Sequence, residues 1–409
     1  MRHVWLSRRH GIAPPRPHPL ARSRVADRLN DALAFLWSRG LSPKPELDPD
    51  YLWRIGGEGF GEADEHGGRS PEDVADFRLR LELLCASLHA EAQLNPLGLI
   101  MAYGQLTRAI RRRHALGRLW NDRPDLLETA LAPPIAVVGQ MRAGTTRVHR
   151  LLGADPKHCG TRFANSIDPL PRLPGWKRAK AGAALAIART INPWLETLHP
   201  FGANRIDEEL PWLAGALSPC AYEAQWHIPS YVAFSEERDA GPVYREFARI
   251  LRTDAALEDD TGRPRVLKVP QFSEDLSALV AVLPDIRIVT TDRCNRRTLE
   301  SSVSLVASQV AFQTDHGDLD AIRAEWSRKL ALREERMDAA LARFDGPRAE
   351  ACFDALGKDW RAVMRGVYRD LGLTLDEAAL TAMEAEQALS ERGAHHAHRA
   401  QIKQFEPMA

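Results

Sequence analysis

The chain has 409 residues, of which 44% are hydrophobic and 27% charged, and its 55 Lys and Arg residues balance its 55 Asp and Glu residues. This apolar fraction excludes a mainly disordered chain, and the length predicts two or three units or one large α/β domain with helical additions. The balance of charge gives no reason to expect nucleic acid or an anionic membrane surface as the main partner.

The cysteines and the apolar runs indicate where the protein works. Five cysteines are scattered along the chain without a C-x-x-C pair, which argues against a disulfide framework or a zinc site and favours a reducing compartment. No apolar run approaches the roughly 18 to 20 residues that span a bilayer. We therefore expect a cytoplasmic protein without a membrane span.

The first part of the chain is predicted to be helical. Residues 1–24 are rich in Arg, Pro and His and are expected to form a flexible arm. From 25 to 131, apolar residues recur at three- and four-residue intervals, most clearly in 76–90 and 96–119. The glycine-rich stretch 56–61 interrupts this pattern and is expected to be a loop.

The pattern then changes to that of an α/β domain. Pro133 and Pro134 end the helical pattern, and residues 135–138 form a short, wholly apolar run that is typical of a buried parallel strand. Two further strand-like runs lie within 265–270 and 286–291, and helical patterns lie between and after them at 146–152, 274–282 and 297–311. Alternating strands and helices predict parallel βαβ units, and hence a core at 132–315. Residues 316–409 are expected to be a helical region that completes the same domain.

The loop after the first strand is the most specific feature of the sequence. Gly139 and Gly144 permit a tight turn whose backbone N–H groups converge on an anion at the start of the next helix. A complete nucleotide-triphosphatase loop requires Lys where this chain has Thr145, and the cation stands instead at Arg142. The loop therefore predicts a phosphate cradle in a P-loop-type parallel sheet, and an ordinary glycine-bearing turn remains the alternative.

This loop resembles the first signature of the sulfotransferase family, a strand followed by P-[KR]-[ST]-G-T-T. The match is at Arg142, Gly144, Thr145 and Thr146, whereas Met141 and Ala143 depart from the signature. The family transfers a sulfonate from 3′-phosphoadenosine-5′-phosphosulfate (PAPS) to an acceptor hydroxyl or amine. The resemblance implies that the donor is bound by Gly139, Arg142, Ala143, Gly144, Thr145 and Thr146.

A second family signature binds the donor's 3′-phosphate through an Arg at a strand end and a Ser eight positions later. Arg293 and Ser301 have this spacing. A guanidinium can bind phosphate through two hydrogen bonds, and a hydroxyl early on the helix can face the strand end. Because a basic C-terminal segment closes over the donor in the family, Arg399 is implied as a further nucleotide contact. Five other stretches look like the bacterial branch of the family: 91–95, 205–209, 266–270, 283–285 and 368–373.

Sulfonate transfer needs positive charge at the leaving phosphate and a base for the acceptor proton, and it requires no metal in principle. Arg142 and Lys268 are the expected catalytic cations, although a Lys at a strand end can equally be a surface residue. Family members carry a His shortly after this Lys, where the present chain has Phe272. The usual base is therefore missing.

Two residues are candidates for that base. Glu208 lies between Asp207 and Glu209, whose like charges would raise its pKa towards neutrality; alternatively, the three acids only mark a helix N-terminus. His149, on the helix after the loop, is the second candidate, and a structural, packed His is the alternative.

The acceptor is expected to be a small molecule, and the aromatic residues between 176 and 234 indicate an apolar or ring-bearing one if some of them line its site rather than the core. The sequence carries no signal for an oligomeric state.

Two other functions remain open. A P-loop nucleotide phosphotransferase or NTPase could use Asp292 for Mg²⁺, but Thr145 argues against it. A catalytically inactive nucleotide-binding relative is suggested by Phe272 and by Cys294-Asn295 after Arg293, where the family shows R-D-P.

Overall fold

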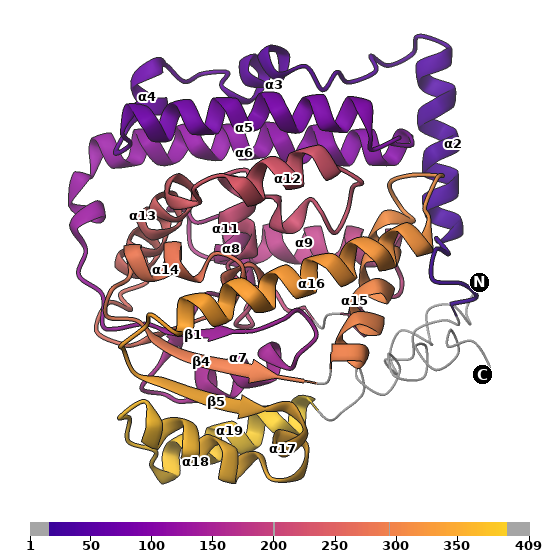
Figure 1. The fold of residues 1–409 in the computed structure, drawn as a ribbon. Helices are drawn as coiled ribbons and strands as arrows, with labels where there is room; N and C mark the ends of the chain where they lie inside the picture. Colours follow the sequence, from indigo (N-terminus) through magenta and orange to yellow (C-terminus); the bar gives the residue numbers. More distant parts are fainter. Residues whose placement is uncertain (1–15, 199–200, 294, 391–409) are drawn as a thin grey trace.

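A parallel five-stranded sheet lies at the centre of the computed structural model, which describes residues 16–198, 201–293 and 295–390 (Figure 1). The strand order is β2-β3-β1-β4-β5, and every neighbouring pair is parallel. The strands are β1 (Ile135–Val138), β2 (Cys159–Gly160), β3 (Arg265–Leu267), β4 (Arg287–Asp292) and β5 (Arg348–Cys352). The predicted α/β fold with a parallel sheet is confirmed, and the three predicted strands correspond to β1, β3 and β4.

The structure also contains two strands that the sequence does not predict. β5 lies within 316–409, which is expected to be helical, so the α/β core extends beyond 315 to Cys352. Along β5, exposed Arg348, Glu350 and Cys352 alternate with buried Ala349 and Ala351. An edge strand whose buried side chains are only alanines gives a weak apolar pattern, and β2 is only two residues long.

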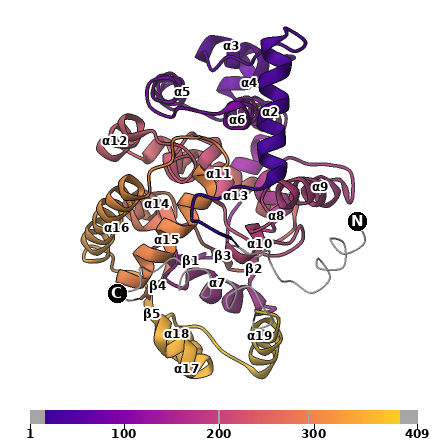
Figure 2. The same ribbon diagram turned by 90° about the vertical axis from the view of Figure 1, so that its right-hand side faces the viewer.

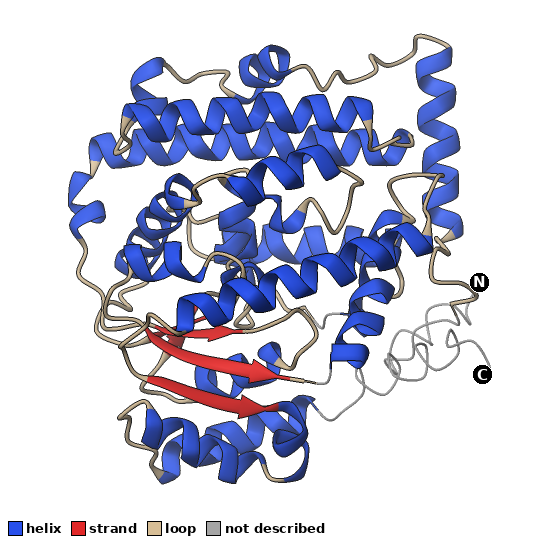
Figure 3. Cartoon of the chain, viewed as in Figure 1, coloured by secondary structure: helices blue, strands red, loops and turns tan. Residues whose placement is uncertain are grey.

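Helices cover both faces of the sheet (Figure 3). Side chains of a strand point alternately to opposite faces, so Ile135 and Val137 of β1 join one core cluster and Ala136 and Val138 join another. The first cluster includes residues of α7 (Thr145–Ala154), α18 (Trp360–Asp370) and α19 (Glu377–Ser390). The second includes residues of α13 (Gly241–Leu257) and α14 (Leu276–Val282). β1 is therefore buried on both faces, as its wholly apolar sequence predicts.

The N-terminal region is helical, as expected. It consists of α2 (Arg24–Ser38), α3 (Pro49–Gly56), α4 (Glu62–His66), α5 (Pro71–Ala90), α6 (Pro96–Asp122) and η2 (Pro124–Glu128). The long helices α5 and α6 begin with the same device, a side-chain cap from Ser70 or Asn95 followed by Pro at the first helical position. They share an apolar cluster and form a helical layer above the sheet in Figure 1.

Residues 16–23 differ from the flexible arm expected at 1–24. Arg16 is fully buried, and its guanidinium lies 5.8 Å from the ring centroid of Trp194. Ser23 caps α2 by accepting the Ala26 N–H, and its hydroxyl donates to the carbonyl of Ile191. Packing against the later helices thus holds this part of the arm, and residues 1–15 lie outside the described residues.

The remaining helices connect the strands. Between β2 and β3 come α8 (Phe163–Ile167), α9 (Trp176–Ile191), α10 (Leu195–Leu198), α11 (Leu210–Gly215), η3 (Pro219–Ala221), α12 (Pro229–Glu237) and then α13. Later come η4 (Pro270–Ser273), α15 (Asn295–Val310), α16 (Leu319–Leu341) and α17 (Phe353–Lys358). Figure 2 views the carboxyl end of the strands, with α7 and α15 beside β1 and β4. None of the helices in the described ranges is long and apolar enough to cross a membrane.

Candidate active site

The loop between β1 and α7 is tightly packed against its neighbouring strands. A Cβ on Gly139 would collide with the side chain of Thr291 in β4 and lie 2.9 Å from its carbonyl oxygen. Gly144, which precedes α7, has a φ of 92°, and a Cβ there would lie 2.5 Å from the ring of Phe353. Arg142 is also left-handed, with a φ of 71°. Larger residues at the two glycines would displace the loop from the end of the sheet.

Three residues predicted to bind the donor meet at this loop. The Nε of Arg142 donates to the Oγ of Ser301 on α15 at 2.9 Å, and Nη1 of Arg293 donates to the carbonyl of Arg142 at 2.6 Å. Arg293 also lies over the ring of Phe353, 4.5 Å from its centroid. Burial, together with the charge of Arg293, lowers the pKa of Arg142 to about 10, against the opposing charge of Glu208. Two guanidinium groups held this close favour an anion beside them.

A second group of predicted residues joins β3 to the start of α7. Lys268 directly follows β3 and is only 1% exposed. Its ammonium forms an ion pair with Glu208 and donates to the Oγ1 of Thr146 at 3.1 Å. Thr146 is the second residue of α7, so the carboxylate of Glu208 lies next to the phosphate loop. In the ion pair this carboxylate is an anion, the form that can accept a proton.

The acidic cluster 207–209 does not act as a simple helix cap. Asp207 Oδ1 accepts the N–H of Glu208 at 2.8 Å. Glu209 precedes α11 but makes no side-chain cap there; its Oε2 accepts the N–H of Lys268 at 3.0 Å instead. Glu209 is fully buried, and burial raises its pKa to about 7. The carboxylates at 208 and 209 therefore both contact Lys268, one through its side chain and one through its backbone.

His149 and Phe272 lie in the interior. The Nε2–H of His149 donates to the carbonyl of Val266 in β3 at 3.1 Å. Burial, with the charge of Lys268, lowers the pKa of His149 to about 3, so the imidazole is neutral. Phe272 is fully buried and meets the ring of Phe247 edge-on at 5.7 Å. The Phe at the family's His position is thus a core residue.

Two residues of the site are not predicted from the sequence. Phe353 contacts Arg293 and lies against Gly144, but it follows β5, one of the two strands that the sequence pattern misses. The turn-forming Asp345-Gly346 pair and the alternation along 348–352 are the signals that could have found it. Glu209 was predicted only as a neighbour of Glu208, because local sequence does not reveal its burial.

The other predicted residues fall into two groups. Arg399 lies outside the described residues. Of the aromatic residues between 176 and 234, most belong to core clusters, namely Trp194, Trp212, Tyr222, Trp226 and Tyr231, whereas Trp176 is 57% exposed. Within the part of the chain that the structure describes, no group of three or more His, Cys, Asp or Glu residues is placed to hold a metal ion.

Comparisons with known proteins agree with this geometry. A family model described as the sulfotransferase family matches residues 133–377. The chain is similar to sulfotransferase STF1 from Mycobacterium tuberculosis H37Rv, with 26% identity and a TM-score of 0.70 over 93% of this chain and 98% of that one. It shares its fold with sulfotransferase STF9 from Mycobacterium avium, with 18% identity and a TM-score of 0.74 over 89% and 97% of the two chains. No curated protein matches the sequence. Because the family match covers more than half of the chain, this protein belongs to the sulfotransferase family and is a sulfonate-transferring enzyme.

Proposed function

We propose that the protein transfers a sulfonate from PAPS to a hydroxyl or amine of a small-molecule acceptor. The observation that carries this proposal is the meeting of Arg142, Arg293 and Ser301 at the phosphate loop, through hydrogen bonds of 2.9 and 2.6 Å. These are the cation of the first signature and the two residues of the second. They come from the ends of β1 and β4 and from α15, so only the fold brings them together.

The residues present suit a nucleotide with phosphates at both ends of its ribose. Loop 139–146 offers backbone N–H groups at the start of α7, and its glycines let the loop pack against Thr291 and Phe353. Arg293 and Ser301 would hold the 3′-phosphate, and Arg142, Lys268 and the two threonines would hold the 5′ side. When bound, PAPS supplies a sulfonate attached to a phosphate leaving group.

Glu208 is the proposed base. Its carboxylate is paired with Lys268, whose ammonium contacts Thr146 on the phosphate loop. An acceptor that gives its proton to Glu208 would therefore have its nucleophilic atom close to the 5′ side of the donor. Lys268 would at the same time place positive charge near the leaving oxygen. His149 is proposed to support β3 rather than to move a proton, because its Nε2–H is used by the Val266 carbonyl.

A thermal-shift experiment tests the donor. We expect 3′,5′-ADP to raise the Tm, since a ligand at a hundred times its Kd stabilises the native state by about 2.7 kcal/mol, and ATP with Mg²⁺ to have little effect. Stabilisation by ATP with Mg²⁺ alone would favour a nucleotide phosphotransferase instead.

A turnover experiment tests the loop. With labelled PAPS and a panel of acceptors, Arg142→Ala is expected to lose about 10²–10³ in rate, the typical value of one charged donor on the transferring group. Arg343→Ala, an exposed residue just before β5, is the matched control and should keep wild-type turnover. Wild-type rates in Arg142→Ala would contradict the assignment of the loop. Binding of 3′,5′-ADP without turnover of any acceptor would support a catalytically inactive relative.

A further inference from the structure

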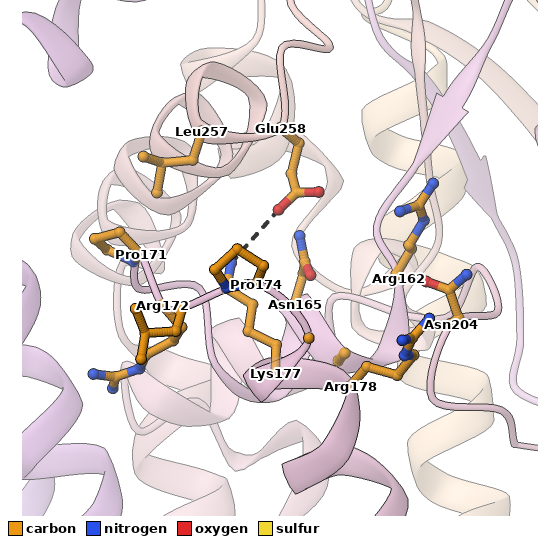
Figure 4. Close-up of a pocket in the computed structure, with 13 residues that line it drawn as sticks. Arg162, Asn165, Pro171, Arg172, Pro174, Lys177, Arg178, Asn204, Leu257 and Glu258 are labelled. Atoms are coloured by element: carbon orange, nitrogen blue, oxygen red, sulfur yellow. Dashed lines mark ion pairs between the residues drawn. The ribbon is translucent and has the colours of Figure 1, made fainter.

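A pocket of about 350 Å³ opens where the segment after β2, the start of α9 and the end of α13 meet (Figure 4). Its volume lies in the range of about 300–1,000 Å³ that is usual for small-molecule sites. Among the described residues that line it, none belongs to loop 139–146, and Arg293 and Ser301 are not among them. The pocket is therefore separate from the proposed donor site.

The charged residues that line this pocket are mainly basic. They are Arg162, Arg172, Lys177, Arg178 and Glu258. The carboxylate of Glu258 lies 3.6 Å from the ammonium of Lys177, and Arg172 pairs with a carboxylate outside the lining. Arg162 and Arg178, by contrast, form no ion pair within the described part of the chain, and both are exposed. Two guanidinium groups therefore remain for a ligand.

These two arginines share one wall of the pocket. Figure 4 shows Arg162, Arg178 and Asn204 on the same side, away from the pair of Lys177 and Glu258. A guanidinium can give two parallel hydrogen bonds to an oxyanion, and the amide of Asn204 can add a further donor. This wall thus suits a carboxylate, phosphate or sulfate group.

The register of the sheet places this wall beside the proposed active site. β2 pairs with β3, with Gly160 opposite Val266. Arg162 and Lys268 each stand two residues later, so they lie at the same level, at the carboxyl end of the sheet. Ligands of open α/β sheets bind outside this end. Arg162 is therefore one strand away from the cation that pairs with Glu208.

The segment that carries the proposed base also reaches the pocket. Arg162 forms an antiparallel bridge with Ile206, and Asn204 of the pocket wall precedes Glu208 by four residues. Since an extended chain rises about 3.4 Å per residue, the backbones of Asn204 and Glu208 are no more than about 14 Å apart. One small molecule can therefore contact both the pocket and the base.

We propose that this pocket binds an anionic group of the acceptor, while the hydroxyl or amine that receives the sulfonate lies at Glu208. Because Glu208 is the proposed base, this assignment rests on the proposed function, and it narrows the acceptor to compounds that carry an oxyanion. The anionic group binds reversibly and takes no part in the transfer.

A free inorganic anion fits the pocket less well. It would satisfy the arginines but would leave much of the 350 Å³ unfilled, including the apolar surface of Pro171, Leu173, Pro174 and Leu257. An organic acceptor can cover this surface with its carbon skeleton while its anionic end contacts the arginines.

Titration calorimetry with pyrophosphate tests the pocket without an acceptor. The full chain is first saturated with 3′,5′-ADP, so that the donor site is filled and further anion binding reports another site. We expect the wild type to bind pyrophosphate, less tightly at high salt. Arg162→Gln/Arg178→Gln should bind about ten-fold or more weakly, since each arginine gives charge-assisted hydrogen bonds.

The matched control removes two exposed arginines outside the pocket. Arg343→Gln/Arg365→Gln should bind pyrophosphate like the wild type. Both double variants should keep the wild-type Tm, because the changed side chains lie at the surface.

Turnover tests whether the anion belongs to the acceptor. Hydroxyphenyl-acetate, -propionate and -butyrate are offered with labelled PAPS, each as the acid and as its neutral methyl ester. In the wild type, kcat/KM should be about ten-fold or more higher for the acid than for the ester. This ratio should fall towards one in Arg162→Gln/Arg178→Gln, with the KM for PAPS unchanged.

Three results would overturn the assignment. Pyrophosphate that fails to bind the wild type, or that binds the pocket variant as tightly as the control variant, would show that the pocket holds no anion. Esters that react as well as acids would show that the anion is not part of the acceptor. A wild type that does not bind 3′,5′-ADP would contradict the proposed function itself, which the pyrophosphate comparison of the two variants does not require.

Discussion

Lys268 affects the two candidate bases in opposite ways. Its ammonium pairs with the carboxylate of Glu208, whereas its charge adds to burial in lowering the pKa of His149 to about 3. A base must reach the acceptor, and His149 is only 1% exposed with its Nε2–H bonded to Val266. Lys268, which we propose to hold the leaving group, would thus also influence which neighbour can take the proton.

Glu208→Gln is therefore expected to lose about 10²–10⁴ in single-turnover transfer, the usual contribution of a general base. The variant should still bind 3′,5′-ADP, because Gln keeps the size of the side chain and its amide oxygen can still accept from Lys268, while in the proposed function the carboxylate itself does not contact the nucleotide. His149→Gln should transfer at a rate closer to the wild type and show its effect in a lower Tm. An active Glu208→Gln beside an inactive His149→Gln would reverse the two roles.

Arg293 and Ser301 are expected to differ, although the same signature contains both. Arg293→Ala should weaken PAPS binding about 10- to 100-fold, the value of a hydrogen bond to a charged group. It should weaken binding of adenosine 5′-phosphosulfate, which lacks the 3′-phosphate, less, because only the contact of Arg293 with the Arg142 carbonyl then remains to be lost. Ser301→Ala should weaken both nucleotides, because Ser301 also accepts the Nε–H of Arg142. Calorimetric titration of both variants with both nucleotides checks this, and equal losses for Arg293→Ala would contradict its role at the 3′-phosphate.

At the scale of elements, the contacts that shape the donor site come from segments far apart in the chain. β5 lies beside β4, with Asp292 opposite Cys352 in the pairing, and this register places Phe353 next to Arg293 and Gly144. The ring holds the guanidinium from one side and blocks any side chain at 144. The C-terminal part of the sheet therefore shapes the loop at the end of β1.

Phe353→Leu should accordingly weaken PAPS binding, because it removes the ring beneath Arg293 but keeps apolar volume. A cation–π contact is worth about 0.5–2 kcal/mol, which corresponds to roughly 2- to 30-fold in affinity. Phe353→Tyr retains the aromatic face and is the matched control. Equal affinities of the Leu and Tyr variants, measured by titration, would show that the ring does not act through Arg293.

The pairing of β5 with β4 shows which parts of the site the sequence can predict and which it cannot. β1 and the loop after it are predictable because a wholly apolar run and a glycine-bearing motif are local signals. Arg293 and Ser301 can be proposed from the sequence because the spacing of the family signature lies within one strand and the following helix and is also local. Phe353 and the burial of Glu209 depend on pairing with β4 and on packing against β3, contacts between residues distant in sequence, so neither has a local pattern.

At the scale of the whole molecule, buried ion pairs connect the helical layer to the sheet domain. Arg69 pairs with Glu246 of α13 at 2.7 Å, and both side chains are almost inaccessible. Burial raises the pKa of Glu246, but the charges of Arg69, Arg113 and Arg249 outweigh burial and lower it to about 2. The stability that this pair contributes is present above the carboxyl's unfolded pKa of about 4.3 and is lost as the pH falls towards 2.

Glu209 has the opposite effect on stability. Its pKa is raised to about 7 by burial, so the folded state binds a proton that the unfolded state has released above about pH 4.3. Its stabilising contribution is full below that pH and is lost as the pH rises through about 7. The free energy of unfolding should therefore decrease between about pH 4.3 and about pH 7, by an amount on the order of 3 kcal/mol for this group.

Glu209→Gln should remove this decrease, because Gln stays neutral at every pH. The neutral His149, whose pKa is lowered to about 3, acts in the opposite direction as its unfolded form gains a proton below about pH 6.5, so the wild-type profile alone does not isolate Glu209. The difference in unfolding free energy between the variant and the wild type does isolate Glu209, because both proteins keep His149. Urea unfolding at a series of pH values should show Glu209→Gln gaining stability relative to the wild type from about pH 4 to 8. Glu350→Gln, an exposed residue of β5, should follow the wild type throughout. Parallel profiles for Glu209→Gln and wild type would mean that the carboxyl at 209 is ionised in the folded protein, so that its contact with the Lys268 N–H is that of a carboxylate.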